Sequence, residues 1–275
     1  MTNEQWLEVF QNIGRTMRAG IAEFLGREGG KVPLGRGAGG DKTFPVDKWA
    51  EDIVLAALER VHAQGEAFTL VSEELGIRKF GGGAVTVIVD PIDGSNNAKN
   101  GVPFFATAIA LLDGDRLAGL RLGYIINLAS GDEFWAVKGG GAYRNGKPIR
   151  TPDHTEITIV AFEASDPATD IPRIQPLLSA AKRTRCFGST ALDLAHLASQ
   201  GMSVFVTATA SRTFDYAAGM LILAEAGGVM TDLEGRSLDD ITVGIGRTVP
   251  LLAAKNAAAH AAAKALLARK RPPLY

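Results

Sequence analysis

Apolar residues near the N-terminus recur at steps of three and four positions. They are Trp6, Phe10, Ile13, Met17, Ile21 and Phe24. This spacing predicts one face of an amphipathic helix, because an α-helix turns about once every 3.6 residues. A second helix is predicted over residues 47–62, with apolar residues such as Ile53 and Leu58 on its buried face. The intervening residues 26–40 are rich in glycine and are predicted to form a mobile loop.

Strands are predicted where β-branched and aromatic residues form short runs bounded by turn residues. In the first half of the chain these runs cover residues 68–71, 85–89, 104–112, 117–124 and 133–137. The turn Asp113-Gly114-Asp115-Arg116 joins the third and fourth runs as a hairpin. Residues 139–146 are predicted to be a turn region.

Beyond a seam at Thr151-Pro152-Asp153, predicted strands and helices alternate. The strands cover residues 158–162, 204–206 and 251–253, and the helices begin near residue 172 and cover residues 189–198, 215–226 and an alanine-rich C-terminal stretch. Alternation of this kind predicts an α/β half over residues 153–275. Residues 1–152 are predicted to be an α+β half.

Composition narrows the possible partners. The chain has 275 residues, with 29 basic and 30 acidic side chains. This balance favours neither a nucleic acid nor a membrane surface as a partner, and no apolar stretch is long enough to cross a bilayer. The single cysteine, Cys186, excludes an internal disulfide and is expected to be a small buried residue. Without a signal-peptide pattern at the N-terminus, a cytoplasmic protein is expected.

The motif Asp90-Pro91-Ile92-Asp93-Gly94-Ser95 directly follows the predicted strand over residues 85–89. Two carboxylates this close repel each other unless a cation lies between them, and hard oxygen ligands favour Mg²⁺ over zinc. Ser95 is expected to cap a helix whose first amides, those of Gly94 and Ser95, would face an anion. An ordinary surface turn remains an alternative, because Asp, Pro and Gly are common turn residues.

Further acidic residues follow predicted strands or open predicted helices. Glu73 and Glu74 follow the strand over residues 68–71. Asp47 and Asp215 each open a predicted helix. Acidic residues are also common helix caps, but their combination with the Asp90 motif favours a metal site.

Three segments of the chain together resemble the signature of the inositol monophosphatase superfamily. They are Glu73-Glu74, Asp90-Pro91-Ile92-Asp93-Gly94-Ser95 and Phe214-Asp215-Tyr216-Ala217-Ala218-Gly219. The resemblance covers nearly the whole chain. Phe44-Pro45-Val46-Asp47 and Arg212-Thr213-Phe214-Asp215 are most similar to archaeal-type enzymes that hydrolyse both fructose 1,6-bisphosphate and inositol monophosphate.

The resemblance implies a layered α-β-α-β-α fold in which residues 1–152 carry most metal ligands and residues 153–275 complete the active site. It implies a homodimeric, Mg²⁺-dependent phosphatase. Two magnesium ions would be held by Glu73, Asp90, Asp93, Asp215 and the carbonyl oxygen of Ile92. A third ion would be held with help from the loop over residues 26–40.

The resemblance also implies which residues act on the substrate. Asp47, Ser95 and Glu73 would be catalytic, and Asp47 and Ser95 would form a hydrogen-bonded pair that deprotonates a water activated by the ions for in-line attack on phosphorus. The implied substrate-binding residues are Asp93, Gly94, Ser95, Arg185, Gly188, Ser189 and Arg212. A plain helix cap remains the alternative for the turn at Gly188 and Ser189.

Two departures from the family pattern concern the substrate. Residues 96–100 follow Ser95 with asparagines and a lysine where the family usually carries aromatics. Residues 206–209 lack the acid with which inositol-selective members bind sugar hydroxyls. Arg185 and Arg212 are candidates for holding a second phosphate bidentately, which favours a bisphosphate. The alternative interpretation is that Arg185 and Arg212 are ordinary surface cations without a role in substrate binding.

The first candidate substrates are therefore fructose 1,6-bisphosphate and inositol monophosphate. A second hypothesis keeps the chemistry but changes the substrate to a 3′-phosphoadenosine nucleotide or NADP. A third is a non-catalytic regulatory binding protein on the same fold. Loss of a metal-binding acid would favour the third hypothesis, but Glu73, Asp90, Asp93 and Asp215 are all present.

Overall fold

The computed structural model describes residues 1–25, 32–40 and 42–268. Two long helices begin the chain, α1 (Asn3–Ile21) and α2 (Pro45–Ala63). Thr2 caps α1, since its hydroxyl accepts a hydrogen bond from the Gln5 amide while the Gln5 side chain accepts one from the Thr2 amide. The predicted apolar face of α1 is buried from Trp6 to Ile21.

Eight strands form a large mixed sheet in the order β10-β9-β8-β7-β6-β5-β3-β4. Their bounds are β3 (Phe68–Ser72), β4 (Gly76–Phe80), β5 (Val85–Asp93), β6 (Ala106–Asp113), β7 (Leu120–Asn127), β8 (Glu133–Val137), β9 (Gly141–Arg144) and β10 (Lys147–Ile149). The pair β3–β5 is parallel, and the other pairs are antiparallel. Strands β4, β9 and β10 were not predicted. They lie at or next to the sheet edges, and β4 and β10 carry exposed residues.

Five strands form a second sheet in the order β12-β11-β13-β15-β14. Their bounds are β11 (Ile159–Glu163), β12 (Arg183–Arg185), β13 (Val204–Thr207), β14 (Val229–Thr231) and β15 (Leu251–Ala254). The first three strands in this order run parallel, and β15 and β14 add antiparallel pairs. The helices of this part of the chain are α4 (Pro167–Ala180), α5 (Thr190–Ala198), α6 (Thr213–Ala226) and α7 (Ala257–Leu267).

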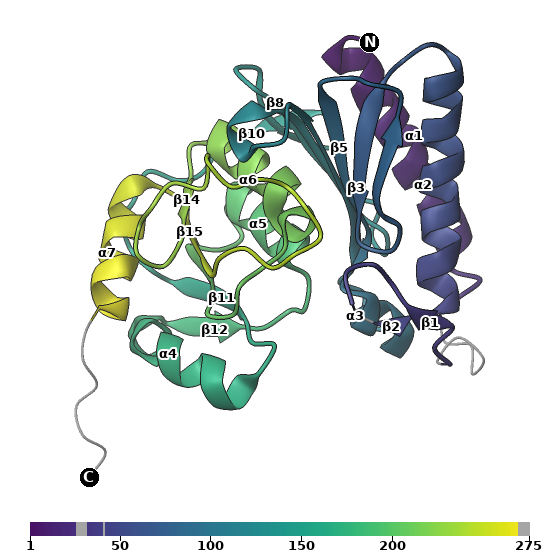
Figure 1. The fold of residues 1–275 in the computed structure, drawn as a ribbon. Helices are drawn as coiled ribbons and strands as arrows, with labels where there is room; N and C mark the ends of the chain where they lie inside the picture. Colours follow the sequence, from purple (N-terminus) through teal and green to yellow (C-terminus); the bar gives the residue numbers. More distant parts are fainter. Residues whose placement is uncertain (26–31, 41, 269–275) are drawn as a thin grey trace.

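The elements stack in five layers. Helices α1 and α2 cover one face of the large sheet, α5 and α6 lie between the two sheets, and α4 and α7 cover the outer face of the small sheet (Figure 1). Three clusters of buried side chains fill the spaces between these layers. The predicted α-β-α-β-α layered fold is confirmed. The division of the chain at residue 152 remains a prediction, because the central cluster mixes side chains from both sides of it.

Helix α6 approaches the large sheet so closely that a side chain would not fit between them. A Cβ atom on Gly123 of β7 would lie 2.7 Å from the carbonyl oxygen of Ala218. On an adjacent face of α6, a Cβ atom on Gly219 would lie 2.6 Å from Leu194 of α5. These two contacts fix the position of α6 between the sheets.

Three further expectations can be compared with the described residues. Part of the glycine-rich segment is a small hairpin, β1 (Gly35–Arg36) with β2 (Lys42–Thr43), whereas residues 26–31 of the predicted loop lie outside the described residues. Cys186 is exposed, so the expectation of a buried cysteine is wrong. Within the part of the chain that the structure describes, no helix has the length and apolar character needed to span a bilayer.

Candidate active site

Asp90 and Asp93 lie at the end of β5, in a bulged part of the strand. Asp90 pairs with Ala108 of β6 and Asp93 pairs with Ala106, so three steps along β5 match two steps along β6. In a regular strand, residues three apart point to opposite faces. The extra residue of the bulge lets both carboxylates reach the same side. The Thr107 hydroxyl donates to the carbonyl oxygen of Pro91 at 2.9 Å and helps to hold the bulge.

Asp47 and Asp215 occupy equivalent positions in the first turns of α2 and α6. The Asp47 carboxylate accepts a hydrogen bond from the Phe44 amide at 2.8 Å, and the Asp215 carboxylate accepts one from the Arg212 amide at 2.9 Å. Each acid therefore satisfies an amide that the helix leaves unpaired. The same bond fixes the direction of each carboxylate.

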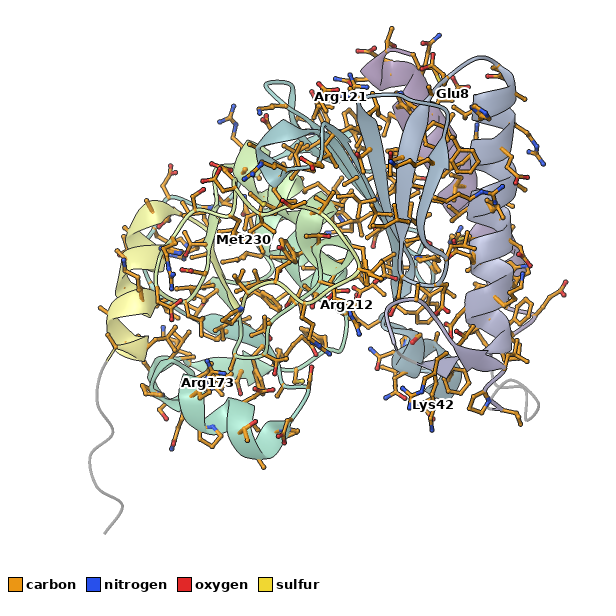
Figure 2. All side chains as sticks on the ribbon, in the orientation of Figure 1. Glu8, Lys42, Arg121, Arg173, Arg212 and Met230 are labelled. Carbon is orange, nitrogen blue, oxygen red and sulfur yellow. The ribbon has the colours of Figure 1, made fainter. Side chains whose placement is uncertain are left out.

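Glu73 and Glu74 follow β3 and are contacted by the glycine-rich hairpin. The amides of Ala38 and Gly39 donate to the carbonyl oxygens of Glu74 and Glu73 at 3.0 Å and 2.8 Å. Arg212 lies between the two halves of the chain (Figure 2) and donates to the carbonyl oxygen of Gly39 at 2.7 Å. Its guanidinium is also 3.9 Å from the Glu73 carboxylate. Arg212 thereby connects α6 with the hairpin and with Glu73.

The charges around Asp90 suit a bound cation. Asp90 is 2 % exposed, and its Oδ1 atom has no hydrogen-bond partner among the described residues. Burial, together with the negative charges of Glu73, Asp93, Asp215 and Asp47, holds the pKa of Asp90 well above its ordinary value. A buried carboxylate in this environment stays charged only with a cation beside it.

The donor set therefore fits a hard divalent ion such as Mg²⁺, because these side chains offer oxygen only. Glu73, Asp90, Asp93 and Asp215 are the residues that would hold it. Among the residues that the structure describes, no three carboxylate, histidine or cysteine side chains are already close enough to enclose an ion.

Asp93 is anchored to the small-sheet half of the molecule. Its Oδ2 atom accepts hydrogen bonds from the Ser189 hydroxyl at 2.5 Å and from the Ala191 amide at 2.8 Å. Ser189 is also the N-cap of α5, so the cap interpretation of the Gly188-Ser189 turn is confirmed. Burial raises the pKa of Asp93 to about 7. The turn at Gly188 and Ser189 thus positions a predicted metal ligand.

Ser95 does not cap a helix, contrary to expectation. Gly94, in the left-handed conformation at φ 84°, is the N-cap of α3 (Ser95–Asn100), and Ser95 is the first helical residue. A Cβ atom at Gly94 would lie 2.9 Å from the carbonyl oxygen of Gly188. Both the backbone conformation and the close approach therefore require glycine, which places the helix start one residue earlier than predicted.

Lys99 is a site residue that sequence reasoning missed. Its ammonium lies 3.4 Å from the Ser95 hydroxyl, 3.7 Å from the Asp47 carboxylate and 3.3 Å from the centre of the Phe44 ring. The structure thus brings Asp47 and Ser95 to the same cation, and their direct hydrogen bond remains a prediction. Burial raises the pKa of Asp47, and the charge of Lys99 opposes that effect.

A cavity of about 510 Å³ opens beside the carboxylates. Its lining includes Asp93, Gly94, Ser95, Gly188, Arg212 and Asp215 from the predicted site, together with Glu163, Thr207, Thr209 and Arg247. Arg185 does not reach this cavity. It lines a separate hollow with Phe104, Phe187 and His196, and its guanidinium donates to the carbonyl oxygen of Thr184.

No sequence motif marks Glu163 or Arg247 as part of the site. Glu163 ends β11 and pairs in register with Thr207 of β13, within the stretch that lacks an acid of its own. Arg247 forms an isolated bridge with Arg212 and donates to the carbonyl oxygen of Ala210 at 2.7 Å. Both residues enter the site through strand pairing over long sequence separations.

Comparison with known proteins agrees with this geometry. The inositol monophosphatase family model matches residues 7–273. A fructose-1,6-bisphosphatase/inositol-1-monophosphatase of Methanothermobacter thermautotrophicus is 30% identical over 266 residues, covering 93% of this chain and 94% of that protein. A bifunctional NADP phosphatase/NAD kinase of Methanococcus maripaludis is 28% identical, over 85% of this chain and 44% of that protein.

The solved structure of an inositol monophosphatase-fructose 1,6 bisphosphatase superposes with a TM-score of 0.81 at 28% identity, covering 93% of this chain and 96% of that chain. Family model, full-length relative and structure agree over nearly all of the sequence. The chain therefore belongs to the inositol monophosphatase family.

Proposed function

We propose that this phosphatase hydrolyses phosphomonoesters of small sugars or polyols with the help of Mg²⁺, with fructose 1,6-bisphosphate and inositol monophosphate as first candidates. The observation that carries the proposal is the buried Asp90 carboxylate, which lacks a partner for Oδ1 and lies in the field of four other acids. When bound, the ions would lower the pKa of the attacking water and neutralise charge on the phosphate oxygens.

The residues of the chain would divide the remaining work. Asp47, which accepts a hydrogen bond from the Phe44 amide and faces Lys99, would accept the proton of the attacking water together with Ser95, which contacts the same lysine. Gly94 and Ser95 would contact the phosphate, since both line the cavity at the start of α3. Glu73 would orient the water as well as hold an ion.

Two arginines in the cavity support the hypothesis of a bisphosphate substrate. Arg212 lines the cavity but is partly engaged by Gly39 and Glu73. Arg247 is exposed at the same cavity, where a second phosphate would meet it. Arg185 stays a predicted phosphate ligand, although its side chain lies in a different hollow.

NADP is a second candidate substrate, because one relative is named as a bifunctional NADP phosphatase/NAD kinase. The non-catalytic alternative is less well supported, because all four acids of the predicted metal site are present and three of them, Glu73, Asp93 and Asp215, surround the fourth, Asp90. The proposal also includes a cytoplasmic location and a homodimer. Sedimentation equilibrium tests whether the protein is a homodimer.

The decisive experiment compares phosphate release from fructose 1,6-bisphosphate, inositol 1-phosphate, 3′-phosphoadenosine 5′-phosphate and NADP, each with Mg²⁺ and with EDTA. The proposal expects Mg²⁺-dependent release, with the highest kcat/KM on one of the first two substrates. Highest activity on a nucleotide would favour the second candidate. No release from any substrate would favour the non-catalytic protein.

A further inference from the structure

Glu163 contributes a carboxylate to the wall of the cavity and is not among the acids that would hold metal. It ends β11 and lies in register with Thr207 of β13. Asp93 and Arg212 line the same cavity. A carboxylate on this wall opposes a second phosphate by charge repulsion, but it is a strong acceptor for a hydroxyl group.

The Glu163 carboxylate is held from behind by two groups. The Gly188 amide donates to Glu163 Oε1 at 2.8 Å. On the other side lies Asp193 of α5, which is fully buried and whose two oxygens receive no hydrogen bond from any donor among the described residues. Two facing carboxyl groups without a donor between them share a proton.

Asp193 is the member of the pair that keeps this proton. Burial and the charge of Glu163 hold the pKa of Asp193 well above its ordinary value. Burial raises the pKa of Glu163 as well, but hydrogen bonds from the Gly188 amide and from the protonated Asp193 oppose that effect. Glu163 therefore stays a carboxylate of fixed orientation, with its remaining lone pairs available to a ligand.

The surroundings of Glu163 suit an uncharged, hydroxylated group. The cavity wall carries the hydroxyl side chains of Ser165, Thr190, Thr207, Thr209 and Ser211. Thr207 and Thr209 are oriented by hydrogen bonds of their own, Thr207 to the carbonyl oxygen of Thr209 and Thr209 to the buried Asp170. Thr207 and Thr209 thus offer acceptor oxygens to a ligand, which match the hydroxyls of a polyol better than an aromatic or apolar leaving group.

We propose that Glu163 accepts hydrogen bonds from hydroxyl groups of the substrate and thereby selects sugar and polyol phosphates over phosphates without hydroxyls, with Asp193 as the residue that positions it. This inference rests on the proposed phosphatase function. Hydrogen bonds to a charged acceptor are strong, and a site built around one rejects ligands that lack the donor.

The test uses two substrates, inositol 1-phosphate and p-nitrophenyl phosphate, which has no hydroxyl groups. Glu163→Gln is expected to lower kcat/KM for inositol 1-phosphate by roughly 10- to 100-fold, mainly through KM, and to change kcat/KM for p-nitrophenyl phosphate less than about threefold. Retained hydrolysis of p-nitrophenyl phosphate also shows that the variant is folded. Asp166→Asn is the matched control, since it removes a nearby exposed charge outside the cavity lining.

Product inhibition provides a second readout. The inhibition constant of myo-inositol should rise in Glu163→Gln, whereas that of inorganic phosphate should stay unchanged. Equal loss on both substrates, or no loss on either, would overturn the inference while leaving the phosphatase proposal in place. If the wild-type protein with Mg²⁺ hydrolysed neither substrate, the proposed function and this inference would fall together.

Discussion

Glu51 should make the free energy of unfolding of the metal-free protein depend on pH. One substitution, Glu51→Gln, should remove that dependence. The residue lies in α2 and is 3 % exposed. The Ser72 hydroxyl donates to its Oε2 atom at 2.7 Å, whereas Oε1 has no hydrogen-bond partner among the described residues. Burial raises the pKa of Glu51 from an ordinary 4.5 to about 7.

The folded protein holds the proton of Glu51 more tightly than the unfolded chain does, so the associated stability is present below about pH 4.5 and is lost as the pH rises to about 7. The difference between the two pKa values corresponds to about 3 kcal/mol of unfolding free energy. About 2.5 kcal/mol of this is lost between roughly pH 5 and pH 8.

Glu51→Gln should abolish that loss, because an amide does not titrate. The new amide nitrogen has no acceptor, which costs about 1–3 kcal/mol at every pH. The diagnostic quantity is therefore the change with pH, measured by urea unfolding in EDTA. Relative to wild type, the variant should gain about 2–3 kcal/mol from pH 5 to pH 8. Glu59→Gln, at a half-exposed position of the same helix, should show no such gain.

Parallel stability curves for wild type and Glu51→Gln across this pH range would refute the reasoning. They would mean that Glu51 is solvated or paired in the folded protein, so that its pKa stays near the ordinary value. A gain shared equally by Glu59→Gln would refute it as well, since a general change in net charge would then be the cause.

Two further predictions concern the support of the site. Lys99→Met removes the cation that lowers the pKa of Asp47, so the acidic limb of the pH–rate profile should move to higher pH, and an unmoved limb would contradict the role given to Asp47. Gly123→Ala places a methyl group 2.7 Å from the carbonyl oxygen of Ala218. The variant should lower the free energy of unfolding in urea by about 1–3 kcal/mol. The resulting shift of α6 should also weaken Mg²⁺ binding. Gly82→Ala, where a Cβ atom meets nothing within 4 Å, is the control, and equal stability of the two variants would show that α6 is not tightly seated.

Local sequence patterns predicted the parts of the fold that depend on local periodicity. The apolar stripe of α1 and the β-branched run of β5 correspond to elements in the structure, and the acids at the ends of strands and starts of helices gather around Asp90. The layered order came from the family resemblance, because no local pattern states which face of a sheet a helix will cover.

The missed features arise from contacts between distant segments. Strand β4 carries three exposed residues in a row, so it lacks the alternation by which a strand is recognised. The bulge between Asp90 and Asp93 is defined only by pairing with β6. Glu163 and Lys99 belong to the site because of strand register and the seating of α3, and neither has a signature in the sequence.

The most direct test of the central claim is the rate of Mg²⁺-dependent phosphate release by wild type and Asp90→Asn on fructose 1,6-bisphosphate and inositol 1-phosphate. The substitution keeps the shape of the side chain but removes the charge that would hold an ion. The account predicts a folded variant by circular dichroism with turnover at least about a thousand-fold lower, equivalent to about 4 kcal/mol of transition-state stabilisation. Turnover close to that of wild type at saturating Mg²⁺ would contradict it.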